Sequence, residues 1–138
     1  MSTATLVRDA FIEKDLKYKD FRELDNGDTL MIAGFNGKNV TFDLIMIFDK
    51  EDHTVTMRVG RLAKIPIDRQ FEVFSTLNEL NRTYRFLRFY SDPDDFVTVQ
   101  YDYVVTENET AEPAMEMIFR TLQIIEEGFP RIMKAIWS

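Results

Sequence analysis

The segment VTFDLIMIFDKEDHTVTMRVGRL, residues 40–62, decides the fold. It contains a mostly apolar run, residues 40–48, and an alternating run, residues 54–62, joined by a polar turn at residues 49–53. Apolar and polar residues alternate in the second run, which is the two-residue period of a β-strand. The two runs therefore predict an antiparallel hairpin, around which the rest of the chain can be placed.

Two Asn-Gly pairs, at residues 26–27 and 36–37, predict further turns upstream of this hairpin. Asn and Gly both tolerate positive φ, as the two central positions of a type I′ hairpin turn require. These turns enclose the apolar run at residues 31–35 and extend the hairpin to a meander of three strands. Residues 19–24 are the candidate for a fourth strand.

A second hairpin is predicted downstream, with strands at residues 86–90 and 96–105 and a five-residue turn between them. Pro93 fixes φ in this turn, and the aspartates around it favour turn geometry. In the first meander, Gly60 is expected to mark a β-bulge or a strand crossing.

Three segments show the spacing of apolar residues that indicates an amphipathic helix. They cover residues 4–16, residues 68–84 and the stretch from Pro113 to near the C-terminus. Thr3 or Thr5 is the expected N-cap of the first helix, and Asp68 that of the second. The apolar stripe of the second helix is predicted to comprise Phe71, Phe74, Leu77, Leu80 and Tyr84.

Gly128 and Pro130 interrupt the periodic pattern of the last helix. Proline has no N–H to donate, and its ring crowds the preceding turn. We therefore expect a kink or break at this point, which would leave residues 131–137 as a separate short helix.

The order of elements is helix, three or four strands, helix, strand pair, helix. Clustered strands without strand–helix alternation indicate an α+β fold, with an antiparallel sheet of five or six strands and helices packed mainly on one face. No internal repeat or linker divides the chain, so residues 1–138 are expected to form a single domain.

Composition excludes several classes of function. The 138 residues carry 17 basic and 24 acidic side chains, a net charge of −7, which disfavours binding to nucleic acid or to an anionic membrane surface. The chain has no cysteine, and His53 is the single histidine, so thiolate chemistry and multi-histidine metal sites lack their ligands. Without a signal-like N-terminus or a membrane-spanning apolar run, a cytoplasmic location is expected.

No group of residues carries a specific chemical signature. The glycines form no phosphate-binding fingerprint. Two acidic turns, residues 49–53 and 92–95, could offer carboxylates to a metal, but neither has the pattern of an EF-hand loop. Because hairpin turns are commonly acidic, we interpret both as solvated turns. We therefore assign no catalytic, cofactor-binding or metal-binding residue, and expect a protein that is not an enzyme.

The central strands are apolar on both faces. Phe42, Leu44 and Met46 share one face of their strand, while Ile45 and Ile47 occupy the other. One interpretation is that the first or last helix covers the second face. The other is that this face is a patch for a second subunit, a peptide or a lipophilic ligand.

The segment FEVFSTLNELN, residues 71–81, resembles the Leu-Asn-x-Leu-Asn helix signature of the YbjN-type domain, a proposed bacterial sensory transduction regulator. The order of elements agrees over essentially the whole chain. It also resembles the fold of type III secretion chaperones, which are small acidic cytoplasmic proteins that dimerise and hold partly unfolded clients. The resemblance supplies no catalytic residues, and it leaves Asn78 and Asn81 as helix-surface or capping groups that fix the turn into Phe86.

Two functions follow as hypotheses. The first is a non-enzymatic bacterial protein-binding domain, chaperone-like or regulatory and homodimeric, that docks a client segment on an apolar sheet or helix surface. The alternative is a domain that binds a small apolar ligand between sheet and long helix. The expected lining of that cavity is Tyr101, Tyr103, Phe89 and Met57.

Overall fold

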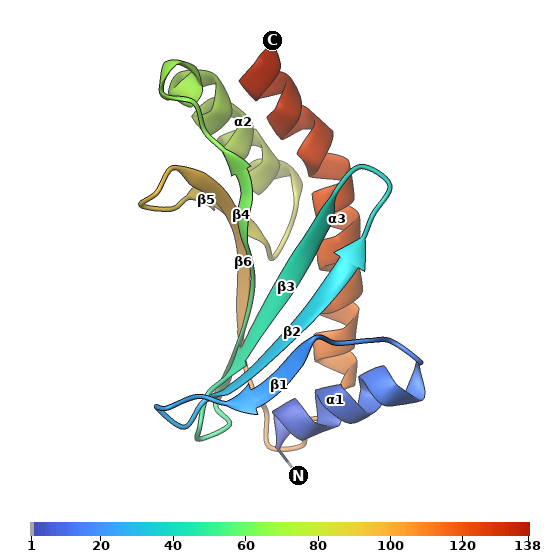
Figure 1. Ribbon diagram of the computed structural model, residues 1–138. Helices are drawn as coiled ribbons and strands as arrows, with labels where there is room; N and C mark the ends of the chain where they lie inside the picture. Colours follow the sequence, from blue (N-terminus) through green and yellow to red (C-terminus); the bar gives the residue numbers. More distant parts are fainter. Residues whose placement is uncertain (1) are drawn as a thin grey trace.

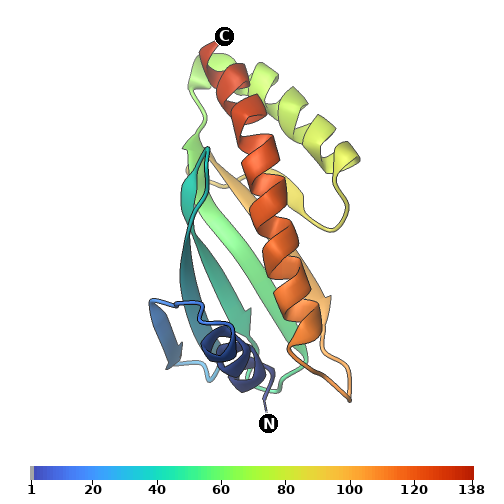
Figure 2. The same ribbon diagram turned by 90° about the vertical axis from the view of Figure 1, so that its right-hand side faces the viewer.

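A six-stranded antiparallel sheet organises the computed structural model, which describes residues 2–138. The strand order across the sheet is β1-β2-β3-β4-β6-β5. All three α-helices lie on one face of this sheet, as predicted (Figures 1 and 2). The strands are β1 (Asp20–Glu23), β2 (Thr29–Asn36), β3 (Thr41–Phe48), β4 (Thr54–Lys64), β5 (Arg88–Ser91) and β6 (Phe96–Val104).

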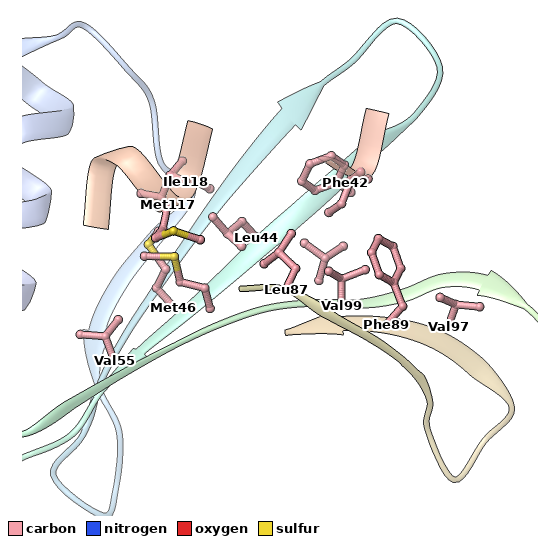
Figure 3. Close-up of a cluster of buried hydrophobic side chains, with 14 of the residues drawn as sticks. Phe42, Leu44, Met46, Val55, Leu87, Phe89, Val97, Val99, Met117 and Ile118 are labelled. Atoms are coloured by element: carbon pink, nitrogen blue, oxygen red, sulfur yellow. The ribbon is translucent and has the colours of Figure 1, made fainter. Parts of the chain in front are cut away.

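The core lies between the helices and the inner face of the sheet. Phe42, Leu44 and Met46 of β3 all point inward and are buried, which confirms the predicted alternation. Leu44 and Met46 pack toward Met117 and Ile118 of the long helix α3 (Glu112–Trp137), as Figure 3 shows. The period of two thus follows directly from one face being covered by helices.

The first two helices begin differently from the prediction. Helix α1 (Thr3–Glu13) is capped by Ser2, whose hydroxyl accepts the Thr5 N–H, so neither threonine is the cap. Asp68 does not cap the second helix. It lies in a 3₁₀ turn, η1 (Ile67–Arg69), that leads into α2 (Gln70–Thr83).

Helix α3 is continuous through Pro130, so the predicted break, with residues 131–137 as a separate helix, is wrong. A proline at position 130 leaves the carbonyl of Glu126 without its helical N–H partner. Asn39, at the tip of the β2–β3 hairpin, supplies a replacement because its Nδ2 donates to that carbonyl at 3.1 Å. The Glu126 carboxylate in turn accepts the Asn39 backbone N–H. A contact from the sheet thus preserves the helix.

The two Asn-Gly turns lie where they were predicted, but they are not type I′ turns. Gly27 has φ +93°, whereas Asn26 and the pair at residues 36–37 do not have positive φ. The predicted bulge at Gly60 is confirmed, because the register between β4 and β6 shifts between Val59 and Ala63.

Candidate binding surfaces

The outer face of the sheet carries an apolar row. In the part of the chain that the structure describes, no helix crosses this face, so the interpretation that a helix covers it is wrong (Figure 2). Ile32 pairs with Ile45 and Leu30 pairs with Ile47 across β2 and β3. These four side chains are outside the main core cluster and shield one another from solvent. An uncovered apolar row is a feature of binding surfaces.

Ion pairs surround this row. Lys19 contacts Asp43 at 2.6 Å, and its side chain crosses directly over Gly34, where a Cβ would lie only 2.7 Å from Lys19 Cε. Two further pairs on the same face join Arg22 to Asp20 at 2.9 Å and Arg88 to Asp102 at 3.3 Å. These pairs are solvent-exposed, so each adds little to stability. The outer face is thus apolar over β2 and β3 and polar on the strands to either side.

A second apolar surface lies on η1 and α2. Ile67, Phe71 and Phe74 occupy successive turns and are 86%, 80% and 44% exposed. The sequence predicted that Phe71 and Phe74 belong to the buried stripe, and this is wrong. The buried positions of α2 are Val73, Leu77 and Leu80. We call Ile67, Phe71 and Phe74 the α2 stripe.

The end of α3 lies at the same end of the molecule as this stripe (Figure 1). The Arg69 guanidinium donates to the Ala135 carbonyl at 3.0 Å and ties η1 to the last turn of α3. Trp137, the next-to-last residue, is 81% exposed. Three large apolar side chains that are at least four-fifths exposed therefore lie at one end of the domain.

The acidic turn at residues 49–53 is held by its own backbone. Asp49 accepts the N–H groups of Glu51, His53 and Thr54, the last at 2.7 Å. The Thr54 N–H is the main cause that lowers the pKa of the Asp49 carboxyl below its ordinary value. Oxygens of Asp49 and Glu51 and a nitrogen of exposed His53 lie within 4.8 Å of one another. The geometry of Asp49 is that of a residue capping a solvated turn.

The two asparagines of the helix signature have different environments. Both are exposed on α2, but Asn81 forms two hydrogen bonds with the backbone of Phe89. Its Nδ2 donates to the Phe89 carbonyl at 3.1 Å, and its Oδ1 accepts the Phe89 N–H at 2.7 Å. Asn81 therefore fixes the connection from α2 into β5.

The four residues expected to line a ligand cavity do not form one together. Met57 and Phe89 are buried in the packed core, while Tyr101 and Tyr103 are half-buried and stack with ring centres 5.9 Å apart. Burial raises the pKa of Tyr103 strongly, and within the described residues its hydroxyl has no hydrogen-bond partner.

An apolar hollow lies elsewhere, between the tip of the β2–β3 hairpin and α3. Its volume is about 350 Å³. Phe35 and Phe42 line it from the sheet, and Phe119 and Leu122 line it from the helix. Sequence periodicity alone could not reveal this hollow, because it depends on how far the hairpin tip lies from the helix.

The fold defines an α+β domain with an open antiparallel sheet and helices on one face. Residues 4–133 match the family model of YbjN, described as a "Putative bacterial sensory transduction regulator", and the chain belongs to this family. No curated protein matches the sequence. No helix among residues 2–138 has the length and hydropathy needed to cross a membrane.

A solved structure shares this fold. The crystal structure of YbjN from E. coli, described as a putative transcription regulator, superimposes with a TM-score of 0.63 at 15% sequence identity. The alignment covers 91% of this chain and 86% of the other. At this level of identity the likeness establishes the fold, which confirms the predicted α+β architecture, while the family model confirms the recognition of the family.

Proposed function

We propose that residues 1–138 form a single protein-binding domain without a catalytic role, regulatory or chaperone-like, that works as a homodimer in the bacterial cytoplasm. The α2 stripe is the observation that supports this function. Ile67 and Phe71, one helical turn apart, are each at least four-fifths exposed. An isolated exposed apolar residue is ordinary, but a contiguous stripe at helical spacing is typical of a helix that packs against a partner.

The stripe suits a second copy of the chain. In a two-fold dimer the same surface meets itself, so one self-complementary helix face is sufficient. Burying an apolar side chain of this size contributes roughly 1.5–3 kcal/mol, and aromatic residues are frequent anchors of interfaces. Phe71 is accordingly the residue on which the dimer should depend most.

The dimer can be tested by sedimentation over a dilution series. The double variant Ile67→Ser, Phe71→Ser should shift the protein to monomer while its far-ultraviolet circular dichroism stays unchanged. Ile12→Ser is the matched control, since Ile12 is an exposed isoleucine on α1, away from the stripe. A wild-type protein that is already monomeric, or a double variant that remains dimeric, would contradict this use of the stripe.

Binding of a partner can be located by photocrosslinking. Benzoylphenylalanine placed at position 71 should crosslink to a second copy or to one discrete partner in native cytoplasm, and the same group at position 12 should not. Equal crosslinking from both positions would show that the stripe has no special role.

The second candidate function is binding of a small apolar ligand, and the hollow beside Phe119 and Leu122 favours it. Its volume of about 350 Å³ lies within the range of ligand pockets. Leu122→Trp should fill the hollow and remove any ligand that native mass spectrometry finds on the purified protein. A ligand that stays bound to this variant would place its site elsewhere.

A further inference from the structure

We propose that the gap between β3 and β4 binds an extended acidic segment of a partner protein as an added β-strand. The two strands run together at one end of the sheet and separate toward the other (Figure 1). Their ladder comprises only the pairs from Ile45–Arg58 to Phe48–Val55. This inference uses a different surface from the α2 stripe, but it rests on the proposed protein-binding function.

Backbone groups of β3 face this gap. In an antiparallel ladder, successive residues direct their N–H and C=O groups to opposite sides. Val40 accepts the Gly37 N–H in the hairpin, so the even-numbered residues of β3, such as Phe42, direct their backbone groups toward β2. Asp49 donates its N–H to the Thr54 carbonyl, so the odd-numbered residues, such as Thr41 and Asp43, direct theirs toward β4. Pairing with β4 ends at Ile45, so among residues 2–138 the N–H and C=O groups of Thr41 and Asp43 have no strand opposite them.

The bulge in β4 keeps the gap open. Between Val59 and Ala63 the strand departs from its regular register with β6, and Arg61 has φ +53°. A hollow of about 480 Å³ lies here, with Thr41 and Asp43 on one side and Gly60 and Arg61 on the other. A Cβ built on Gly60 would meet no atom within 4 Å. The site is thus an internal sheet edge with free space beside it, and added strands bind to sheet edges through backbone hydrogen bonds.

The cations of β4 favour an acidic segment, and Arg61 is the one that lines the hollow. Arg58, Arg61 and Lys64 all lie on β4, and none forms an ion pair with a carboxylate among residues 2–138. Arg61 and Lys64 lie over the ring of Phe96, at 4.0 and 4.7 Å from its centre. Arg58 donates to Gln100 at 3.1 Å, and Lys64 donates to the Asp94 carbonyl at 2.6 Å.

The carboxylate lining the hollow, Asp43, is already paired with Lys19. Arg61 at the hollow, with Arg58 and Lys64 on the same strand, therefore creates a local positive field on a chain whose net charge is −7, since none of them has a carboxylate partner among residues 2–138. A segment with acidic side chains at alternate positions would place them on the same face as these cations. β-Branched residues are expected at strand positions of such a segment because they favour extended backbone.

The test is selection of displayed random decapeptides on the immobilised wild-type protein, followed by fluorescence anisotropy with a synthetic copy of the best binder. The selected peptides should be enriched in Asp and Glu with β-branched residues between them. Thr41→Pro removes one N–H that faces the gap, and Thr41→Val is its matched control because it keeps that N–H. We expect roughly tenfold or greater loss of affinity for the proline variant and no change for the valine variant.

The need for positive charge is tested with a second pair of matched variants. Replacing Arg58, Arg61 and Lys64 with Gln should weaken binding by roughly tenfold and reduce its dependence on salt. Arg88→Gln removes a cation from the same face that already has Asp102 as its partner, so it should leave affinity nearly unchanged.

Hydrogen exchange supplies a readout specific to strand addition. The amides of Thr41 and Asp43 should exchange fast in the free protein and slow down on binding, while those of Phe42 and Leu44 are slow throughout.

Several outcomes would overturn the inference. Peptides without acidic enrichment, or peptides that bind Thr41→Pro as well as Thr41→Val, would exclude strand addition at this gap. Peptides that lose affinity only in the Ile67→Ser, Phe71→Ser variant would refute the inference and leave the protein-binding function intact. A selection that enriches no peptide would count against both. An oligonucleotide whose binding depends on the three cations would assign them to nucleic acid and overturn the proposal.

Discussion

Asn81→Ala tests how α2 is joined to the edge of the sheet. Asp92 donates its N–H to the Phe96 carbonyl, and backbone groups alternate in direction along a strand, so those of residues 88 and 90 also face β6. The N–H and C=O of Phe89 therefore point away from the sheet. The Asn81 amide binds both the N–H and the C=O of Phe89 at this outer edge. One side chain thus takes the place of a further strand, and its truncation removes both hydrogen bonds at once.

The size of the effect follows from these two bonds. Each contributes about 1 kcal/mol to stability. Phe89 is only 2% exposed, so water has limited access to the backbone groups left behind. The connection also contains Phe86 at φ +75°, a conformation that is unfavourable for a bulky residue and needs support from its neighbours. We expect Asn81→Ala to lower the free energy of unfolding by about 2 kcal/mol, or Tm by roughly 7 °C for a chain of this length.

Urea unfolding followed by circular dichroism would measure this difference, with Asn78→Ala as control. Both substitutions replace Asn by Ala on the same helix, so the gain in helix propensity cancels. Asn78 is exposed, and within the described residues its side chain forms no hydrogen bond. If the two variants differ by less than about 0.5 kcal/mol, the Asn81 amide does not support the sheet edge and the reasoning is refuted.

Three further predictions concern the core and the long helix. Gly128→Ala should stabilise the protein by about 0.5–1 kcal/mol in thermal unfolding, because its Cβ would meet its neighbours at ordinary contact distances of 3.5–3.6 Å, whereas Gly128→Leu should destabilise it. Tyr103→Phe should not reduce stability at neutral pH, because the buried hydroxyl has no partner among the described residues. Since the folded-state pKa of Tyr103 lies above its ordinary value of 10.0, the wild type should lose stability above pH 10 more steeply than this variant does. Asn39→Ala should cost less stability in a Pro130→Ala background than in the wild type, because the restored N–H at position 130 can donate to the Glu126 carbonyl. Equal costs in the two backgrounds of a double-mutant cycle would exclude this coupling.

The sheet was predictable because its signals are local. Alternation through β3 correctly placed Phe42 and Leu44 on one face and Ile45 and Ile47 on the other. Tertiary packing determines which face of the sheet the helices cover, and alternation along a single strand does not indicate which face that is. For that reason the sequence allowed a helix over Ile45 and Ile47, and the structure excludes it.

The second helix shows a different limit. Phe71 and Phe74 fit a helical stripe with Leu77 and Leu80, and Val73 fits a neighbouring stripe with the same leucines. Apolar residues cover a wide sector of this helix, and only its packing against α3 and β5 decides which edge of the sector is buried. Sequence periodicity therefore located the apolar residues but could not separate core from surface.

Pro130 shows that a local rule can be overridden from a distance. The rule that proline interrupts a helix rests on a lost hydrogen bond and a crowded turn. Asn39 supplies the missing donor from a hairpin that is remote in sequence, and nothing within the helix indicates this contact. Predictions at such positions fail because the compensating group belongs to another element.

The placement of the helices also decides how the two proposed surfaces can work together. The α2 stripe lies on a helix that covers one face of the sheet (Figure 2), whereas Arg58 of β4, between the buried Met57 and Val59, points to the open face. A dimer formed through the stripe would leave both gaps free, so it would offer two identical sites for acidic segments. A partner that carries two such segments on a flexible linker should then bind the wild type more tightly than the Ile67→Ser, Phe71→Ser variant, because its second segment binds at a high effective concentration. A peptide with one segment should bind both proteins equally. If the divalent peptide gains nothing from the dimer, the two surfaces act independently.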